Sequence, residues 1–346
     1  MAYEQTMFKT SESRNVDPLI NVRNLSVEFH TNAGTVRAVN EISLELRQSE
    51  SLAILGESGS GKSTAAKAIM GLLPKPAGHI VGGEIFFQGQ NLLKAKESVR
   101  RTMRGTQMSI IFQDPLSALN PVFTVGFQIG EAIRYHKSLP RKQVKRAVVE
   151  LMERVKIPDA RNRINNYPHQ FSGGMQQRVM IAMALALNPK VIIADEPTTA
   201  LDVTVQAQIM HLLEELKVEE NMGLILISHD LGVVANYVDS VAVMYAGRIV
   251  EKGKVEEVFR NPAHPYTLGL MNSIPAVNKD STRLTPIKGA PPNLINLSQG
   301  CPFQPRCPFS QDICKNENPT LTEVTQGRKS ACHFSKGVLN NGYEFR

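Results

Sequence analysis

Residues 51–73, SLAILGESGSGKSTAAKAIMGLL, hold the pattern on which the fold depends. An apolar run of strand length leads into the glycine-rich stretch GESGSGKST (56–64), and an alanine-rich helical pattern follows. The stretch matches G-x-x-x-x-G-K-[ST], in which backbone N–H groups surround phosphate oxygens at the start of a helix. Because strand, loop and helix come in the order that this mechanism requires, we predict a nucleotide phosphate site here.

Each residue type in this loop has an expected role. Lys62 would supply positive charge to the terminal phosphates, and the Ser63 hydroxyl would be a ligand of Mg²⁺. The residues expected to bind nucleotide are Gly56, Glu57, Ser58, Gly59, Ser60, Gly61, Lys62, Ser63 and Thr64.

A second motif, VIIADEP (191–197), is an apolar run that ends in two acids. A strand ending in an acid is how this kind of fold places a carboxylate beside Mg²⁺, and Asp195 occupies that position. Glu196 is placed to polarise the attacking water as a general base. Together the two motifs predict a nucleoside triphosphatase; they leave the base open, although no N-K-x-D guanine motif is present.

The rest of the chain indicates an α/β fold. Alternating patterns at 19–29 and 39–46 predict half-buried strands, and GLILISHD (223–230) is a further buried-strand run. Strand and helix patterns alternate, which favours a parallel sheet. Beyond about residue 261 prolines multiply, so we predict a domain boundary at 260/261 and a small, loop-rich C-terminal domain over 261–346.

Composition describes an ordinary globular protein of 346 residues with 42% hydrophobic and 21% charged residues. A formal charge of +7 is compatible with nucleotides, a lipid surface or nucleic acid and does not choose among them. Residues 1–18 are polar and predict a flexible leader rather than a secretory signal. No apolar run approaches the ~20 residues of a membrane-spanning helix, so we expect a cytoplasmic chain.

The stretch FSGGMQQR (171–178), taken with the two motifs above, resembles the L-S-G-G-Q signature of ABC transporter ATPases. The resemblance implies a P-loop NTPase ABC cassette over 19–260, with a parallel-sheet core, an antiparallel β subdomain and a helical subdomain at about 114–180. It also implies a head-to-tail dimer, in which the signature of one subunit closes over the ATP of its partner. Ser172, Gly173 and Gly174 would provide that contact from a helix start.

Three further positions match motifs of the same family. The resemblance implies that Gln113 contacts Mg²⁺ and water, that Asp202 belongs to the D-loop, and that His229 is the switch histidine. The implied catalytic residues are Glu196, His229, Gln113 and Lys62, and the implied Mg²⁺ ligands are Ser63, Gln113 and Asp195.

The chain departs from the family pattern in two places. Phe171 and Met175 replace the Leu and Gln of the usual signature, while the Ser-Gly-Gly core is retained. The aromatic residue that commonly stacks on adenine is absent from 33–36, and Phe29 and His30 are the nearest substitutes.

Within the family, YPHQFSGGMQQRVMIAMALALNP (167–189), HPYTLGLMNSIP (264–275) and GCPFQPRCPF (300–309) resemble the peptide-importer branch. This implies a peripheral ATPase subunit on the cytoplasmic face of the membrane that powers import of oligopeptides or dipeptides. Its implied partners are a second ATPase subunit, two transmembrane permease subunits and a periplasmic or lipid-anchored peptide-binding protein, with no nucleic acid. The alternatives are a nickel complex or a sugar as substrate, or a soluble ABC ATPase acting in DNA repair or on the ribosome.

All four cysteines lie in the C-terminal domain, as C-x5-C-x6-C-x17-C: Cys301, Cys307, Cys314 and Cys332. Four thiolates suit a [4Fe–4S] cluster or Zn²⁺, and free thiols without metal are the third alternative. His333 is a further candidate ligand beside Cys332. The resemblance implies the cluster, and a metal would stabilise a domain with little core of its own. We hypothesise that this domain braces the ATPase dimer; the alternative is a redox or metal-sensing module that regulates the ATPase.

Overall fold

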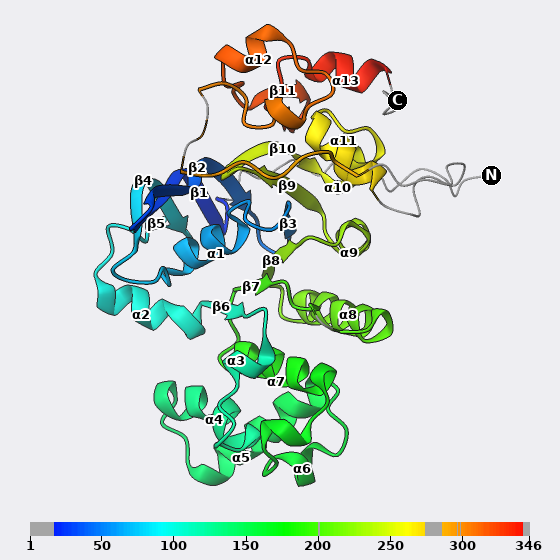
Figure 1. The fold of residues 1–346 in the computed structure, drawn as a ribbon. Helices are drawn as coiled ribbons and strands as arrows, with labels where there is room; N and C mark the ends of the chain where they lie inside the picture. The colour runs from blue at the N-terminus through cyan, green and yellow to red at the C-terminus, as the bar shows by residue number, and fades with distance from the viewer. Residues whose placement is uncertain (1–16, 200, 274–285, 296, 298, 342–346) are drawn as a thin grey trace, which may run out of the picture.

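The computed structural model describes residues 17–199, 201–273, 286–295, 297 and 299–341. Figure 1 shows three tiers: a helical subdomain below, two sheets in the middle, and the C-terminal segment above. The predicted leader, residues 1–18, lies almost wholly outside the described residues.

The larger sheet runs β11-β12-β10-β9-β3-β8-β7-β6 through the described residues. Neighbours among β9, β3, β8, β7 and β6 are parallel, so their carboxyl ends meet at one edge. The strands are β3 (Ser51–Leu55), β6 (Met108–Ile111), β7 (Val191–Asp195), β8 (Gly223–Ser228), β9 (Ser240–Tyr245), β10 (Arg248–Lys254), β11 (Thr322–Thr325) and β12 (Arg328–Ser330). The predicted α/β fold with a parallel core is confirmed.

A smaller antiparallel sheet, β2-β1-β4-β5, lies beside the parallel strands (Figure 1). It consists of β1 (Ile20–Thr31), β2 (Gly34–Leu46), β4 (Gly78–Phe87) and β5 (Gln90–Asn91). Helix α1 (Lys62–Met70) follows the glycine-rich loop, and α2 (Glu97–Thr106) leads to β6.

The helical subdomain is inserted between β6 and β7. It contains α3 (Pro115–Ala118), α4 (Val125–His136), α5 (Arg141–Arg154), α6 (Ala160–Arg163), η1 (Pro168–Gln170) and α7 (Gly173–Leu185). The remaining helices are α8 (Val203–Glu219), α9 (Leu231–Tyr237), α10 (Val255–Arg260), α11 (Pro265–Asn272), η2 (Gln304–Arg306), α12 (Asp312–Asn316) and α13 (Ser335–Asn341).

The apolar strands are buried on both faces, as their continuous hydrophobic runs predict. Because successive side chains point to opposite faces, β3 contributes to two cores. Leu52 and Ile54 pack against the antiparallel sheet and α1, whereas Ala53 and Leu55 face the cluster that includes α7, α8 and the helical subdomain.

The C-terminal segment shares both sheet and core with the strands before it. Strand β12 pairs with β10, with Glu251 opposite Ser330. Phe303 is buried against Tyr245 and Tyr266, at ring-centroid distances of 5.2 and 5.5 Å. The segment is therefore joined more closely than a separate appendage would be, and the boundary at 260/261 stays a prediction.

Candidate functional site

The glycine-rich loop connects β3 to α1 and makes two close backbone approaches. A Cβ atom on Gly56 would lie 2.2 Å from the Met244 carbonyl oxygen, and one on Gly61 would lie 2.2 Å from that of Ala38. Both glycines have positive φ, 155° and 103°, a region that other residues rarely adopt. Glycine is therefore required at both positions by space and by conformation.

Lys62 is folded back into this loop. Its Nζ donates to the carbonyl oxygens of Gly56 at 2.8 Å and Glu57 at 3.0 Å, and only 5% of the residue is exposed. Burial lowers the pKa of Lys62, while the charges of Glu196, Asp195 and Glu57 oppose that shift. The lysine thus places an ammonium inside the curve of the loop, beside the backbone amides that would surround phosphate.

The predicted Mg²⁺ ligands Ser63 and Asp195 are in direct contact. Ser63 Oγ donates to Asp195 Oδ1 at 2.8 Å, although the two residues are 132 positions apart. Burial raises the pKa of Asp195, the Ser63 hydrogen bond lowers it, and the neighbouring Glu196 charge raises it again. A desolvated carboxylate beside a hydroxyl is an oxygen donor pair that fits Mg²⁺.

Two of the other predicted catalytic residues contact the carboxylate of Glu196. Its Oε2 accepts a hydrogen bond from Gln113 Nε2 at 2.9 Å and lies 3.3 Å from Nδ1 of His229. Thr199 Oγ1 also donates to this oxygen, at 3.0 Å. The backbone of Glu196 is left-handed, with φ of 46°, which is uncommon outside glycine. The three side chains therefore hold one carboxylate at the carboxyl edge of the sheet.

Most of these residues line one cleft of about 540 Å³, although Gly56, Glu57, Ser60 and Asp195 are not part of its lining. Its lining consists of Ala38, Ser58, Gly59, Gly61, Lys62, Ser63, Thr64, Gln113, Glu196, Thr199 and His229. Sequence reasoning missed Thr199; the only available signal was its position three residues after the second acid in ADEPTT. Phe29 and His30, the nearest substitutes for the missing adenine-stacking residue, are not part of this lining, and His30 packs against His79.

The signature residues lie elsewhere, at the start of α7. Ser172 caps the helix, its Oγ accepting from the Met175 amide at 3.4 Å. Gly174 packs closely on α8, where a Cβ would lie 2.6 Å from a methyl group of Val205. None of Ser172, Gly173 or Gly174 lines the nucleotide cleft of the described chain. One subunit therefore presents two separate helix starts suited to anions.

The structure accounts for the departures in the signature. Phe171 is buried in the core of the helical subdomain, and the Met175 sulfur accepts a hydrogen bond from Arg163. Both substitutions therefore serve packing around the retained Ser-Gly-Gly core. Asp202 caps α8, its side chain accepting from the Val205 amide at 2.9 Å, and it too lies outside the cleft lining.

The four cysteines line one small cavity in the C-terminal segment, together with His264, Phe303, Phe309, His333 and others. They are free thiols, and burial raises the pKa of Cys307 to about 12 and that of Cys332 to about 11. His333 Nε2 lies 3.1 Å from the Glu317 carbonyl oxygen. In the described part of the chain, no group of three or more His, Cys, Asp or Glu is arranged to hold a single metal ion.

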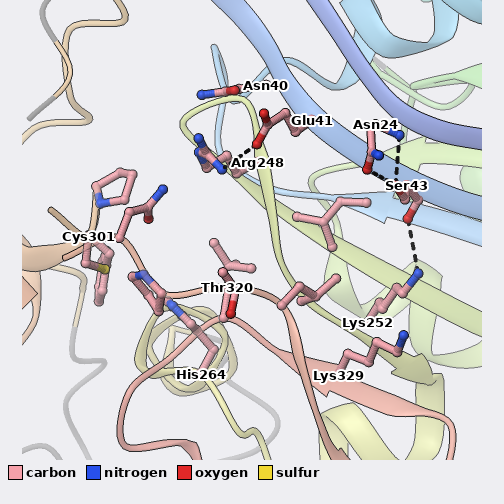
Figure 2. A pocket seen from close by; sticks show the side chains of 18 residues that line it. Asn24, Asn40, Glu41, Ser43, Arg248, Lys252, His264, Cys301, Thr320 and Lys329 are labelled. Carbon is pink, nitrogen blue, oxygen red and sulfur yellow. Dashed lines mark hydrogen bonds and ion pairs between the residues drawn. The ribbon is translucent and has the colours of Figure 1, made fainter. Parts of the chain in front are cut away.

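A separate hollow of about 350 Å³ lies between the antiparallel sheet, β10 and the C-terminal segment (Figure 2). Lys252 and Lys329, which are register partners in the β10–β12 pair, both line it. Lys252 Nζ donates to the Ser43 carbonyl at 3.1 Å, and Arg248 lies 3.7 Å from Glu41. Among the nucleotide motifs, none contributes to this hollow.

The site defines a P-loop nucleoside triphosphatase of the ATP-binding-cassette class. The features that define it are the phosphate loop, the two acids at the end of β7, the hydrogen bonds that hold Glu196, and the second helix start at α7. The family model described as ABC transporter matches residues 39–199, and the model described as oligopeptide/dipeptide transporter, C-terminal region, matches residues 250–314. The chain belongs to the ABC transporter family and, within it, to the ATP-binding proteins of the oligopeptide/dipeptide branch. The predicted family is confirmed.

Two relatives and two solved structures illustrate the likeness. The chain is 49% identical to the oligopeptide transport ATP-binding protein OppD of Salmonella typhimurium, covering 96% of this chain and 98% of that protein. It is 47% identical to the dipeptide transport ATP-binding protein DppD of Escherichia coli, covering 91% and 96%.

The dimeric ATP-binding cassette MJ0796, bound to ADP and Pi in a post-hydrolysis state, matches with a TM-score of 0.62 at 25% identity, covering 68% of this chain and 98% of that one. The cassette cbiO1 of Clostridium perfringens, part of the transporter complex cbiONQ, matches with a TM-score of 0.61 at 30% identity, covering 70% and 91%.

The described residues include no helix that is both long enough and apolar enough to cross a membrane.

Proposed function

We propose that the chain is the ATP-hydrolysing subunit that powers an ABC importer of oligopeptides or dipeptides, bound to the cytoplasmic face of the membrane. The observation that carries this proposal is the hydrogen-bonded Glu196 at the mouth of a cleft that also holds the phosphate loop. Both curated relatives described above are named as peptide transport ATP-binding proteins. The C-terminal family model supports the same branch.

Several residues in and beside the cleft would act in hydrolysis of ATP to ADP and phosphate. The loop amides and Lys62 bind the phosphates and offset their charge. Ser63, Asp195 and Gln113 would hold Mg²⁺, which supplies Lewis-acid stabilisation of charge on the phosphate oxygens. Glu196 orients a water and accepts its proton as the water oxygen attacks the γ-phosphorus and the bond to the bridging oxygen breaks. His229 steadies the carboxylate and is placed to contact the γ-phosphate.

The implied partners fit two surfaces of the chain. Ser172–Gly174 start a helix outside the subunit's own cleft, which suits a head-to-tail dimer with a second ATPase subunit. Exposed apolar side chains gather near Gln113 and on the helical subdomain, which suits contact with two permease subunits. These side chains are Phe112, Leu116, Val122, Phe123, Phe127 and Tyr135. A peptide-binding protein would deliver the substrate on the far side of the membrane.

Glu196→Gln tests the function directly. The amide cannot accept the proton of water, so we expect MgATP binding to persist while ATPase activity and uptake of labelled peptides fall by at least about 100-fold. The variant should be measured in cells and in the purified transporter, with Glu219→Gln as an exposed control. Normal peptide uptake by Glu196→Gln would contradict the proposal. If cells with the unaltered chain took up a nickel complex or a sugar but no peptides, the transported substrate would be that compound and not a peptide.

We also propose that residues 261–346 form an accessory domain whose four cysteines hold a [4Fe–4S] cluster. What supports this is the convergence of four thiols on one cavity, and a set of four soft ligands suits iron–sulfur or zinc. Chain purified without oxygen should contain iron and acid-labile sulfide and absorb visible light. Cys307→Ser should remove these signals and lower thermal stability, whereas Ser310→Ala should not. If the purified chain contained zinc without iron, or no metal at all, the proposed iron–sulfur cluster would be wrong.

A further inference from the structure

Glu57, the second residue of the phosphate loop, is held by a residue from the opposite end of the chain. Arg306 Nη1 donates to Glu57 Oε2 at 2.6 Å, and Nη2 donates to Oε1 at 2.9 Å. The guanidinium thus grips both carboxylate oxygens, the strongest geometry available to an ion pair of this type. Only 5% of the Arg306 side chain is exposed, so solvent screens the pair little.

The main chain of Glu57 is held from the same side. Its N–H donates to the hydroxyl of Tyr266 at 2.8 Å, and Tyr266 is fully buried. Arg306 Nη1 also lies 3.4 Å from the hydroxyl of Tyr245. The position of the loop entrance is therefore set by side chains of β9, α11 and η2 rather than by the loop alone.

Arg306 itself belongs to the turn between the first two cysteines. Its amide donates to the Phe303 carbonyl at 3.0 Å, and its Nε donates to the Lys288 carbonyl at 3.1 Å. The next residue is Cys307, whose amide donates to the Gln304 carbonyl at 3.2 Å. The arginine is thus presented by a structured turn that ends on a cysteine of the four-thiol cavity.

The pair has a consequence for phosphate binding. An acidic side chain in a loop that receives a triphosphate would repel it, and Glu57 belongs to this loop, where its own carbonyl oxygen accepts a hydrogen bond from Lys62 Nζ at 3.0 Å. The guanidinium of Arg306, bonded to both carboxylate oxygens of Glu57, offsets the negative charge of that carboxylate. Loss of the arginine would leave a partly buried, unpaired carboxylate at the entrance of the phosphate site.

We propose that Arg306 is a positioning and charge-neutralising residue of the nucleotide site, through which the C-terminal domain sets the affinity of the phosphate loop for MgATP. The inference rests on the proposed function, because it takes the loop to bind ATP. It adds a residue outside the motifs of the ATPase, and it gives the cysteine-containing turn a direct contact with the nucleotide machinery.

The test is equilibrium binding of MgATP to the full chain. Arg306→Met should weaken binding about tenfold, because the carboxylate of Glu57 is left unpaired. Glu57→Gln combined with Arg306→Met removes both charges and should restore affinity to within about threefold of the unaltered chain. A purely structural arginine would give no such recovery. Arg146→Met, which removes an arginine from the exposed Arg146–Glu150 pair, is the matched control and should leave affinity unchanged.

Arg306→Lys keeps the charge without the two-pronged geometry and should bind about threefold more weakly, which provides a readout if the methionine variant does not fold. Affinity of both Arg306 variants equal to that of the unaltered chain would overturn the inference. So would a double variant no tighter than Arg306→Met. Failure of the unaltered chain to bind MgATP would instead overturn the proposed function, so the two failures are distinguishable.

Discussion

At the scale of single residues, the phosphate loop is limited by contacts with backbone from other segments. Gly56 lies against the Met244 carbonyl, whereas Gly59, in the same loop, has nothing within 4 Å of the position of an added Cβ. Both have positive φ, 155° and 78°, so both sites carry a conformational cost, and only Gly56 carries a steric one as well. Alanine substitutions at Gly56 and Gly59 can therefore be compared to separate the cost of backbone conformation from the cost of a steric clash.

Gly56→Ala should therefore cost more than Gly59→Ala. The added methyl group would collide with a backbone oxygen, so we expect roughly 3 kcal/mol of lost unfolding free energy together with weak MgATP binding. Gly59→Ala should cost about 1 kcal/mol and retain binding. Chemical denaturation and nucleotide titration of both variants would check this. Equal losses in the two would show that conformation alone sets the requirement for glycine.

At this scale, the sequence predicted most of the residues that meet at the Glu196 carboxylate. Gln113, Glu196 and His229 were predicted as site residues, and the structure brings Gln113 and His229 within hydrogen-bonding reach of Glu196. Thr199 and Arg306 were not predicted. Their contacts depend on where Glu196 and Glu57 point after folding, and no local pattern encodes that direction.

At the scale of elements, the β10–β12 pair joins the C-terminal segment to the main sheet through a buried ion pair. Arg328 on β12 donates to Glu251 Oε1 on β10 at 2.6 Å, and both side chains are almost completely buried. Glu251 also accepts from the amides of Ala263 and His264 at 2.9 and 3.0 Å. Burial raises the pKa of Glu251, and the hydrogen bonds from Arg328 oppose that shift.

Arg328→Met should weaken the pairing of β12 with β10. Removing one partner leaves a buried carboxylate unpaired, which costs roughly 3–5 kcal/mol, and hydrogen exchange should accelerate in β12 and α11 first. Lys329→Met, the adjacent control on the same strand, should change stability by less than about 1 kcal/mol. A fully stable Arg328→Met chain would show that the ion pair is not what holds β12 in place.

Element types were predictable where periodicity was strong. The continuous apolar runs of β3, β7 and β8 indicated buried parallel strands, and the structure confirms them. The short strands β11 and β12 carry no such pattern. They form because a neighbouring edge, β10, supplies hydrogen-bond partners, so their existence depends on tertiary contact.

At the scale of the whole molecule, the phosphate loop and the start of the signature helix are two separate sites of one subunit. Residues of the loop line the cleft, whereas Ser172, Gly173 and Gly174, at the start of α7, do not. Figure 1 places α7 in the helical subdomain, below the parallel strands. This separation is what the proposed head-to-tail arrangement with a second subunit would use.

Ser172→Arg should separate binding from assembly. A bulky cation at the helix start would block the phosphate of the partner's nucleotide, so ATPase activity of the assembled transporter should fall at least about tenfold. MgATP affinity of the isolated chain should stay unchanged, because the residue does not line its own cleft. Light scattering with and without ATP would report assembly. Weakened nucleotide binding by the isolated variant would contradict the two-subunit site.

The sequence by itself determined the chemistry, since phosphate loop, acid pair and signature are short motifs whose backbone geometry is local. It also determined the α/β class, because buried parallel strands require continuous apolar runs. Only the tertiary structure decided how the C-terminal segment is used. Glu57 and Arg306 are 249 positions apart, and a contact at that separation follows from strand order and core packing, not from any property that neighbouring residues share.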